Sequence, residues 1–177
     1  MPSPSVKSVR PVRVLSRAQR EAIVRFCGTA GGARGLRVRL ALELALLMGL
    51  RASDICDLDI GGIDPDRMVI RLTQRKTGRE VELPMPEPVL AAVCDYLDSW
   101  RQDFGSDRLM LSVNAPHAPI KVSPVHPADI ARLGCDKFTM HDLRRTFATG
   151  LLEGGADFRG IAALLGHADT NTVHRYL

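Results

Sequence analysis

The chain has 177 residues, 45% of them hydrophobic and 25% charged, which is typical of one globular domain with a buried core. Its formal net charge of +4 at pH 7 permits a polyanionic partner without requiring one. The most apolar run, residues 40–50, is too short to span a bilayer and contains Glu43, and residues 1–5 offer no apolar secretion signal. We therefore predict a cytoplasmic protein with no membrane association.

The cysteines are far apart in the sequence, without a C-x-x-C pair or a histidine at the spacing of a metal ligand. This spacing predicts reduced thiols, no metal site and no other cofactor. The four residues are Cys27, Cys56, Cys94 and Cys135.

The N-terminal end is basic and rich in proline. Residues 1–14 combine three prolines with serines and basic residues, a composition that predicts an extended arm. Residues 1–39 contain nine basic residues and one acid, Glu21. This end is therefore a candidate contact for DNA.

The first predicted helices follow the arm. Ser16 is a suitable N-cap for a helix ending at Phe26, and residues 28–35 are predicted to form a loop. Residues 36–48 are apolar on nearly every face, which predicts a central buried helix that ends at Gly49.

Arg51 follows this turn, next to Ser53 and Asp54, which can cap a short helix ending at Leu58. An arginine beside so apolar a helix must be solvated, paired or used in function. Asp54 has two possible roles, either holding the guanidinium of Arg51 or capping the helix.

Residues 68–73 and 79–83 have strand-like alternation, with turn residues at 64–66 and at Thr77-Gly78. They predict a small three-stranded antiparallel sheet at one edge of a mainly α (α+β) domain. Lys76 lies at the tip of the hairpin.

Residues 86–100 have helical apolar spacing, which predicts an amphipathic helix with one face in the core. The core residues predicted from it are Val89, Leu90, Val93, Leu97 and Trp100.

Residues 101–137 are the least informative part of the sequence. We predict a strand at 109–113 and a short helix at 128–133. His117 and His126 are most simply solvated loop histidines.

A helix predicted for residues 140–153 places His141 and Arg144 on one face, because positions three apart are neighbours on a helix. The same helix has an apolar stripe that would anchor it to the core. Its members are Leu143, Phe147 and Leu151.

The glycines at 154 and 155 end that helix, and Asp157 is a suitable N-cap for the next one, at residues 158–165. His167 follows in a turn, and a last short helix contains Tyr176.

This C-terminal pattern resembles the tyrosine recombinase (phage integrase) family. The family has a His-x-Leu-Arg helix, a Leu-Leu-Gly-His turn and a tyrosine nine residues later, which match residues 141–144, 164–167 and Tyr176. Arg51 in Gly-Leu-Arg resembles the family's first catalytic arginine, and Lys76 resembles its hairpin lysine. The resemblance extends from about residue 15 to the end of the chain.

The resemblance implies a domain that cleaves and rejoins DNA through a 3′-phosphotyrosyl intermediate, without metal or ATP. Tyr176 would be the nucleophile and His141 its base. Arg51 and Arg144 would bind the non-bridging phosphate oxygens, where negative charge accumulates. The full set implied to be catalytic is Arg51, Lys76, His141, Arg144, His167 and Tyr176.

Within that set, His167 would donate a hydrogen bond to the phosphate, and Lys76 would protonate the leaving 5′-oxygen. The implied partner is double-stranded DNA, with self-association on DNA as in the family's tetrameric synapse and a monomer when free. The origin would be bacterial or phage-derived. Predicted DNA contacts are Lys7, Arg10, Arg13, Arg75, Arg79 and Arg145.

Two alternatives stay open. The chain lacks the family's N-terminal core-binding domain and ends one residue after Tyr176, which leaves a catalytically idle DNA-binding remnant as one reading. A type IB topoisomerase uses similar residues but is less favoured by the Leu-Leu-Gly-His turn. Residues 101–137 also depart from the family, which usually has a longer helix there.

Overall fold

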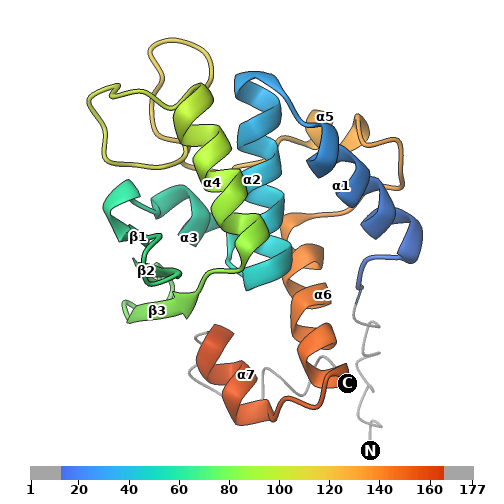
Figure 1. Ribbon diagram of the computed structural model, residues 1–177. Coiled ribbons are helices and arrows are strands. Elements are labelled where there is room, and N and C mark those ends of the chain that lie inside the picture. Colours follow the sequence, from blue (N-terminus) through green and yellow to red (C-terminus); the bar gives the residue numbers. More distant parts are fainter. Residues whose placement is uncertain (1–12, 166–177) are drawn as a thin grey trace, which may run out of the picture.

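The computed structural model describes residues 13–165, in which helices surround the buried helix α2 and a small sheet lies at one edge (Figure 1). This is the mainly α fold that the sequence predicts. The elements are α1 (Arg17–Thr29), α2 (Gly32–Met48), α3 (Ala52–Asp57), η1 (Ile60–Gly62), β1 (Ile63–Asp64), β2 (Val69–Thr73), β3 (Glu80–Pro84), α4 (Glu87–Ser99), α5 (Pro127–Ala131), α6 (Met140–Glu153) and α7 (Phe158–Leu165).

Helix α2 forms the centre of the core because its side chains are apolar on nearly every face. Leu40, Leu42 and Leu44 are fully buried, and both α4 and α6 pack against the helix (Figure 1). The loop predicted for residues 28–35 is wrong except at residues 30 and 31, because α1 continues past the predicted end at Phe26 to Thr29 and α2 already begins at Gly32. Arg34 forms an ion pair of 2.7 Å with Asp129, a distant contact that stabilises this first turn.

Helix α1 begins as predicted, with Ser16 as its N-cap. The Gln19 amide donates to the Ser16 hydroxyl at 3.2 Å, and the Ser16 amide donates to the Gln19 side chain at 2.8 Å. This reciprocal pair satisfies two backbone donors that the first turn would otherwise leave without partners.

The predicted sheet is confirmed. Its strands are antiparallel in the order β1-β2-β3, with Ile70 opposite Leu83 and Leu72 opposite Val81. Ile70 and Leu83 are buried, so one face of the sheet belongs to the core.

Helix α4 buries Val89 and Val93 as predicted, while Leu90, Leu97 and Trp100 are partly buried. Tyr96 was not among the core residues predicted from the sequence, yet its side chain is fully buried.

The segment between α4 and α6 corrects two predictions. The strand predicted at 109–113 is wrong, because in the described part of the chain this segment has only isolated bridges such as Leu111 opposite Pro119. Proline cannot extend a ladder, since it lacks the amide donor. His117 is half-buried rather than solvated, with its ring centroid 4.3 Å from that of Phe104.

His126 is exposed as predicted, but it also caps α5, because its Nδ1 accepts the Ala128 amide at 3.1 Å. Helices α6 and α7 have the predicted bounds. The turn at His167 and the helix containing Tyr176 lie outside the described residues. Between residues 13 and 165 there is no helix with the length and apolarity needed to cross a membrane.

Candidate functional site

The candidate site begins where α2 ends. Gly49 adopts the left-handed conformation (φ +65°), which turns the chain sharply after α2. Two residues later, Arg51 is the N-cap residue of α3, and its side chain is 16% exposed. The turn therefore places a partly buried guanidinium beside the C-terminal end of the central helix.

Asp54 joins Arg51 to the sheet. Its carboxylate is 1% exposed, with Oδ2 3.5 Å from Arg51 Nη1 and Oδ1 accepting the Arg75 amide at 3.0 Å. Of the two roles open for Asp54, the structure supports the contact with Arg51. The predicted cap by Ser53 or Asp54 is wrong, because α3 already begins at Ala52.

The turn between β2 and β3 is held by Gln74, which is almost fully buried. The backbone carbonyl of Gln74 accepts the Gly78 amide at 2.8 Å, and its side chain accepts the Thr77 hydroxyl at 3.0 Å. Lys76 lies in this turn, as predicted, and it is exposed. Asp54 thus links Arg51 to the turn that contains Lys76.

Arg144 is 3% exposed and lies between the ends of two helices. Its guanidinium donates to the carbonyl of Gly49, at the end of α2, and to that of Leu165, at the end of α7, the latter at 2.7 Å. These contacts fix the orientation of a planar cation.

His141 lies one turn before Arg144, at the start of α6, and the residue is exposed. Partial desolvation of the imidazole lowers the pKa of His141 from its ordinary value of 6.5. The positive charges of Arg145, Arg144 and Arg51 lower this pKa further, whereas Asp142 raises it. His141 and Arg144 lie one turn apart on α6, and Arg144 contacts the Gly49 carbonyl, two residues before Arg51, so the three side chains belong to one region of the structure.

Arg145→Gln is expected to raise the pKa of His141, because it removes the largest charge that lowers it. NMR titration of the imidazole should show a midpoint below 6.5 in the wild type and closer to 6.5 in the variant. In the wild type, the pKa of His141 is lower in the folded protein than in the unfolded chain, so the unfolded chain binds the proton more readily. Protonation of His141 therefore lowers the free energy of unfolding as the pH drops below about 6.5. Arg17→Gln, on the exposed side of α1, is the control. An unchanged midpoint in Arg145→Gln would contradict this electrostatic account.

The predicted DNA contacts that are described have different environments. The guanidinium of Arg13 donates to the Lys137 carbonyl, and Arg75 lies 3.4 Å from Asp57. Arg145 lies 3.9 Å from Asp142, and Arg79 is exposed just before β3.

Among the predicted site residues, the structure brings together Arg51, His141 and Arg144. Lys76 is connected to them indirectly, because Asp54 contacts both Arg51 and the backbone of the turn that contains Lys76. Four further predictions lie outside the described residues, and they are Lys7, Arg10, His167 and Tyr176.

Two polar residues that were not predicted from the sequence hold the start of α6. Thr139 is the N-cap, and Asp142 completes the capping box. The spacing Thr-x-x-Asp before an apolar stripe is the signal that predicts this pair.

A family model, related sequences and solved structures all relate this chain to the same family of proteins. Residues 13–177 match the phage integrase family. Tyrosine recombinase XerC of Corynebacterium glutamicum is 32% identical over 177 residues, covering 98% of this chain and 56% of that protein. The chain thus spans about half the length of the curated relatives that it matches.

Solved structures agree with this result. The crystal structure of XerA recombinase superposes with a TM-score of 0.79 at 25% identity, covering 94% of this chain and 60% of that one. The structure of XerH site-specific recombinase bound to its difH substrate, a post-cleavage complex, has the same fold, with a TM-score of 0.78 at 19% identity and coverage of 98% and 52%. Since the family match spans nearly the whole sequence, this chain belongs to the phage integrase family of tyrosine recombinases.

Proposed function

We propose that residues 15–177 form the catalytic domain of a site-specific DNA recombinase, which cleaves and rejoins DNA through a 3′-phosphotyrosyl intermediate. The observation that supports this most directly is the contact between α6 and the end of α2. Through it, Arg144 donates to the Gly49 carbonyl, which brings Arg144 and His141, one turn away on α6, close to Arg51 at the start of α3. The XerH relative in its post-cleavage complex with DNA supports the same reaction class.

The two arginines suit the charge distribution of the reaction. Transfer of a phosphodiester passes through a pentacoordinate state with additional negative charge on the non-bridging oxygens. Arg51 is held by Asp54, and Arg144 is held by two backbone carbonyls. Fixed, permanently charged donors stabilise such oxygens without reorganising during the reaction.

Proton transfer is assigned to the remaining residues. A lowered pKa keeps His141 largely neutral near pH 7, which is the form needed to accept the Tyr176 proton. The exposed Lys76 would protonate the leaving 5′-oxygen after enclosure by DNA, and His167 would donate to the phosphate. Because the phosphotyrosyl link retains the bond energy for rejoining, the reaction requires neither metal nor ATP.

Double-stranded DNA is the proposed partner, with self-association on the DNA. Arg79, exposed just before β3, is one of the described candidates for contact with the DNA backbone. Binding through such arginines should weaken steeply with salt, because neutralised phosphates release counterions.

A suicide-substrate assay tests the proposal. The chain is mixed with nicked duplexes containing candidate sites, and a denaturing gel detects a covalent protein–DNA adduct. We expect an adduct in the wild type and none in Tyr176→Phe, which lacks the nucleophilic oxygen. Salt-sensitive DNA binding without any adduct would contradict the proposal and favour the idle DNA-binding remnant.

A further inference from the structure

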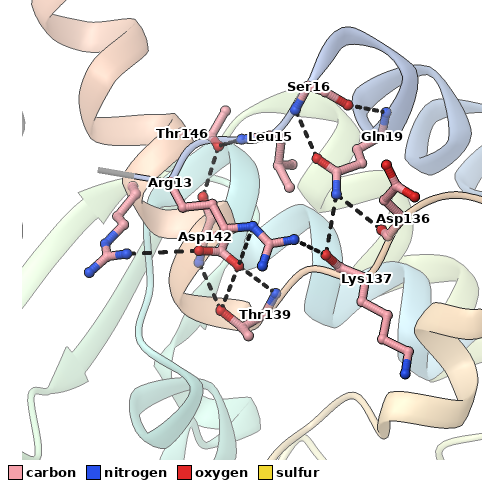
Figure 2. Close-up of polar contacts among 10 residues, drawn as sticks. Arg13, Leu15, Ser16, Gln19, Asp136, Lys137, Thr139, Asp142 and Thr146 are labelled. Atoms are coloured by element: carbon pink, nitrogen blue, oxygen red, sulfur yellow. Dashed lines mark hydrogen bonds and ion pairs between the residues drawn. The ribbon is translucent and has the colours of Figure 1, made fainter. Parts of the chain in front are cut away.

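The segment that precedes α1 lies against the start of α6, the helix that contains His141 and Arg144 (Figure 2). Leu15 is buried, and the Gln19 side chain donates to the carbonyl of Asp136 at 3.0 Å. The Arg13 guanidinium donates to the neighbouring carbonyl of Lys137. Contacts from residues more than a hundred positions apart therefore fasten this segment to the chain just before α6.

Asp142 is the centre of these polar contacts (Figure 2). Its carboxylate, nearly buried, accepts both the amide and the hydroxyl of Thr139, at 2.8 and 2.9 Å. The same oxygen lies 4.0 Å from Arg13 Nε, and the other oxygen lies 3.9 Å from Arg145. One carboxylate thus interacts with the helix cap, the N-terminal segment and a predicted DNA contact.

Thr146 makes the second connection. Its hydroxyl accepts the Leu15 amide at 2.8 Å and donates to the Asp142 carbonyl at 2.8 Å, inside the first turns of α6. The hydroxyl therefore bridges the backbone of the N-terminal segment and the backbone beside His141.

We propose that residues 13–16 are a positioning element of the candidate site, which acts through Asp142 and Thr146 to fix the first turn of α6 and with it the imidazole of His141. This inference rests on the proposed function of His141. The first turn of a helix has amides without intrahelical partners and frays readily, so contacts from outside the helix decide how rigid it is. A small displacement of a proton acceptor lowers the reaction rate strongly.

Thr146→Val tests the connection, because it removes the hydroxyl while keeping the branched shape. Thr146→Ser restores the hydroxyl and should behave as the wild type. The matched control is Thr149→Val on the same helix, since the Thr149 hydroxyl is buried and has no hydrogen-bond partner among residues 13–165. Arg13→Ala is a second variant and should leave the fold intact, because that side chain is 57% exposed.

The first measurement is amide hydrogen exchange of the free protein. The amides of Leu15, Asp142 and Leu143 should exchange about fivefold faster in Thr146→Val, the change expected for losing one hydrogen bond. Faster exchange of Asp142 and Leu143 is also expected in Arg13→Ala. Unchanged exchange of Asp142 and Leu143 in both variants would overturn the proposed coupling, whether or not the protein cleaves DNA.

The second measurement is single-turnover cleavage at saturating DNA. The rate should fall about tenfold in Thr146→Val, with the DNA dissociation constant unchanged and the rate restored in Thr146→Ser. A wild-type rate in Thr146→Val would overturn the positioning role while leaving the proposed function intact. If the wild type forms no adduct, the proposed function fails, and with it the role of residues 13–16 in positioning His141 for catalysis.

Discussion

Arg144→Lys is expected to lower the rate of cleavage on bound DNA by about 10²–10³-fold, the usual cost of removing one donor from an oxyanion site. Lysine retains the positive charge but not the planar fork of donors. The ammonium can satisfy the carbonyl of Gly49 or that of Leu165, but it cannot hold both while also facing a phosphate.

The same substitution should lower the free energy of unfolding by about 1–3 kcal/mol, because one buried carbonyl loses its donor. Urea unfolding measures this loss, and cleavage is then compared under conditions in which both proteins are fully folded. Arg17→Lys is the control, since that side chain is 88% exposed. If Arg144→Lys cleaves DNA at the wild-type rate when folded, the guanidinium has only a structural role.

The parts of the fold that sequence predicted best are those specified by neighbouring residues. Helix α6 has the predicted bounds because its apolar stripe and the glycines that follow it lie within one short stretch. The start of α2 was predicted too late, because the contact between Arg34 and Asp129 spans 95 residues. The strand predicted at 109–113 had suitable residues but, within residues 13–165, pairs only through isolated bridges rather than with a partner strand.

In the candidate site, too, the features set by neighbouring residues were predicted and those set by distant contacts were not. The motif spacing located Arg51, His141 and Arg144, since the family pattern is a property of the sequence itself. Two partners of Arg144 are backbone carbonyls, one of them 95 residues away, and every residue has such a group. No residue type therefore identifies them in advance. The contact between Leu15 and Thr146 was missed for the same reason, because its donor is a backbone amide.

Gly49→Ala is expected to lower the free energy of unfolding by about 2–5 kcal/mol. The left-handed conformation of Gly49 costs about 1–2 kcal/mol for a residue with a Cβ atom. That atom would also overlap Phe147 Cδ1 and lie 2.9 Å from Leu165 Cδ2, and this crowding adds about 1–3 kcal/mol. Thermal or urea unfolding measures the total.

Gly78→Ala separates the two contributions. Gly78 has the same φ of +65°, but an added Cβ atom would meet no heavy atom within 4 Å. This control should therefore lose only the conformational part, about 1–2 kcal/mol. Equal losses in the two variants would show that Phe147 and Leu165 move aside, and the close packing around Gly49 would then contribute nothing to stability.

The overlap at Gly49 should also affect the site itself. The Gly49 carbonyl accepts a hydrogen bond from Arg144, and the Leu165 carbonyl, next to the crowded side chain, accepts the other. Displacing either carbonyl removes a contact that Arg144→Lys already weakens. The stability losses of Gly49→Ala and Arg144→Lys should therefore be less than additive in the double variant, since residues that share a contact are coupled. Strict additivity would mean that Gly49 terminates α2 without helping to hold Arg144.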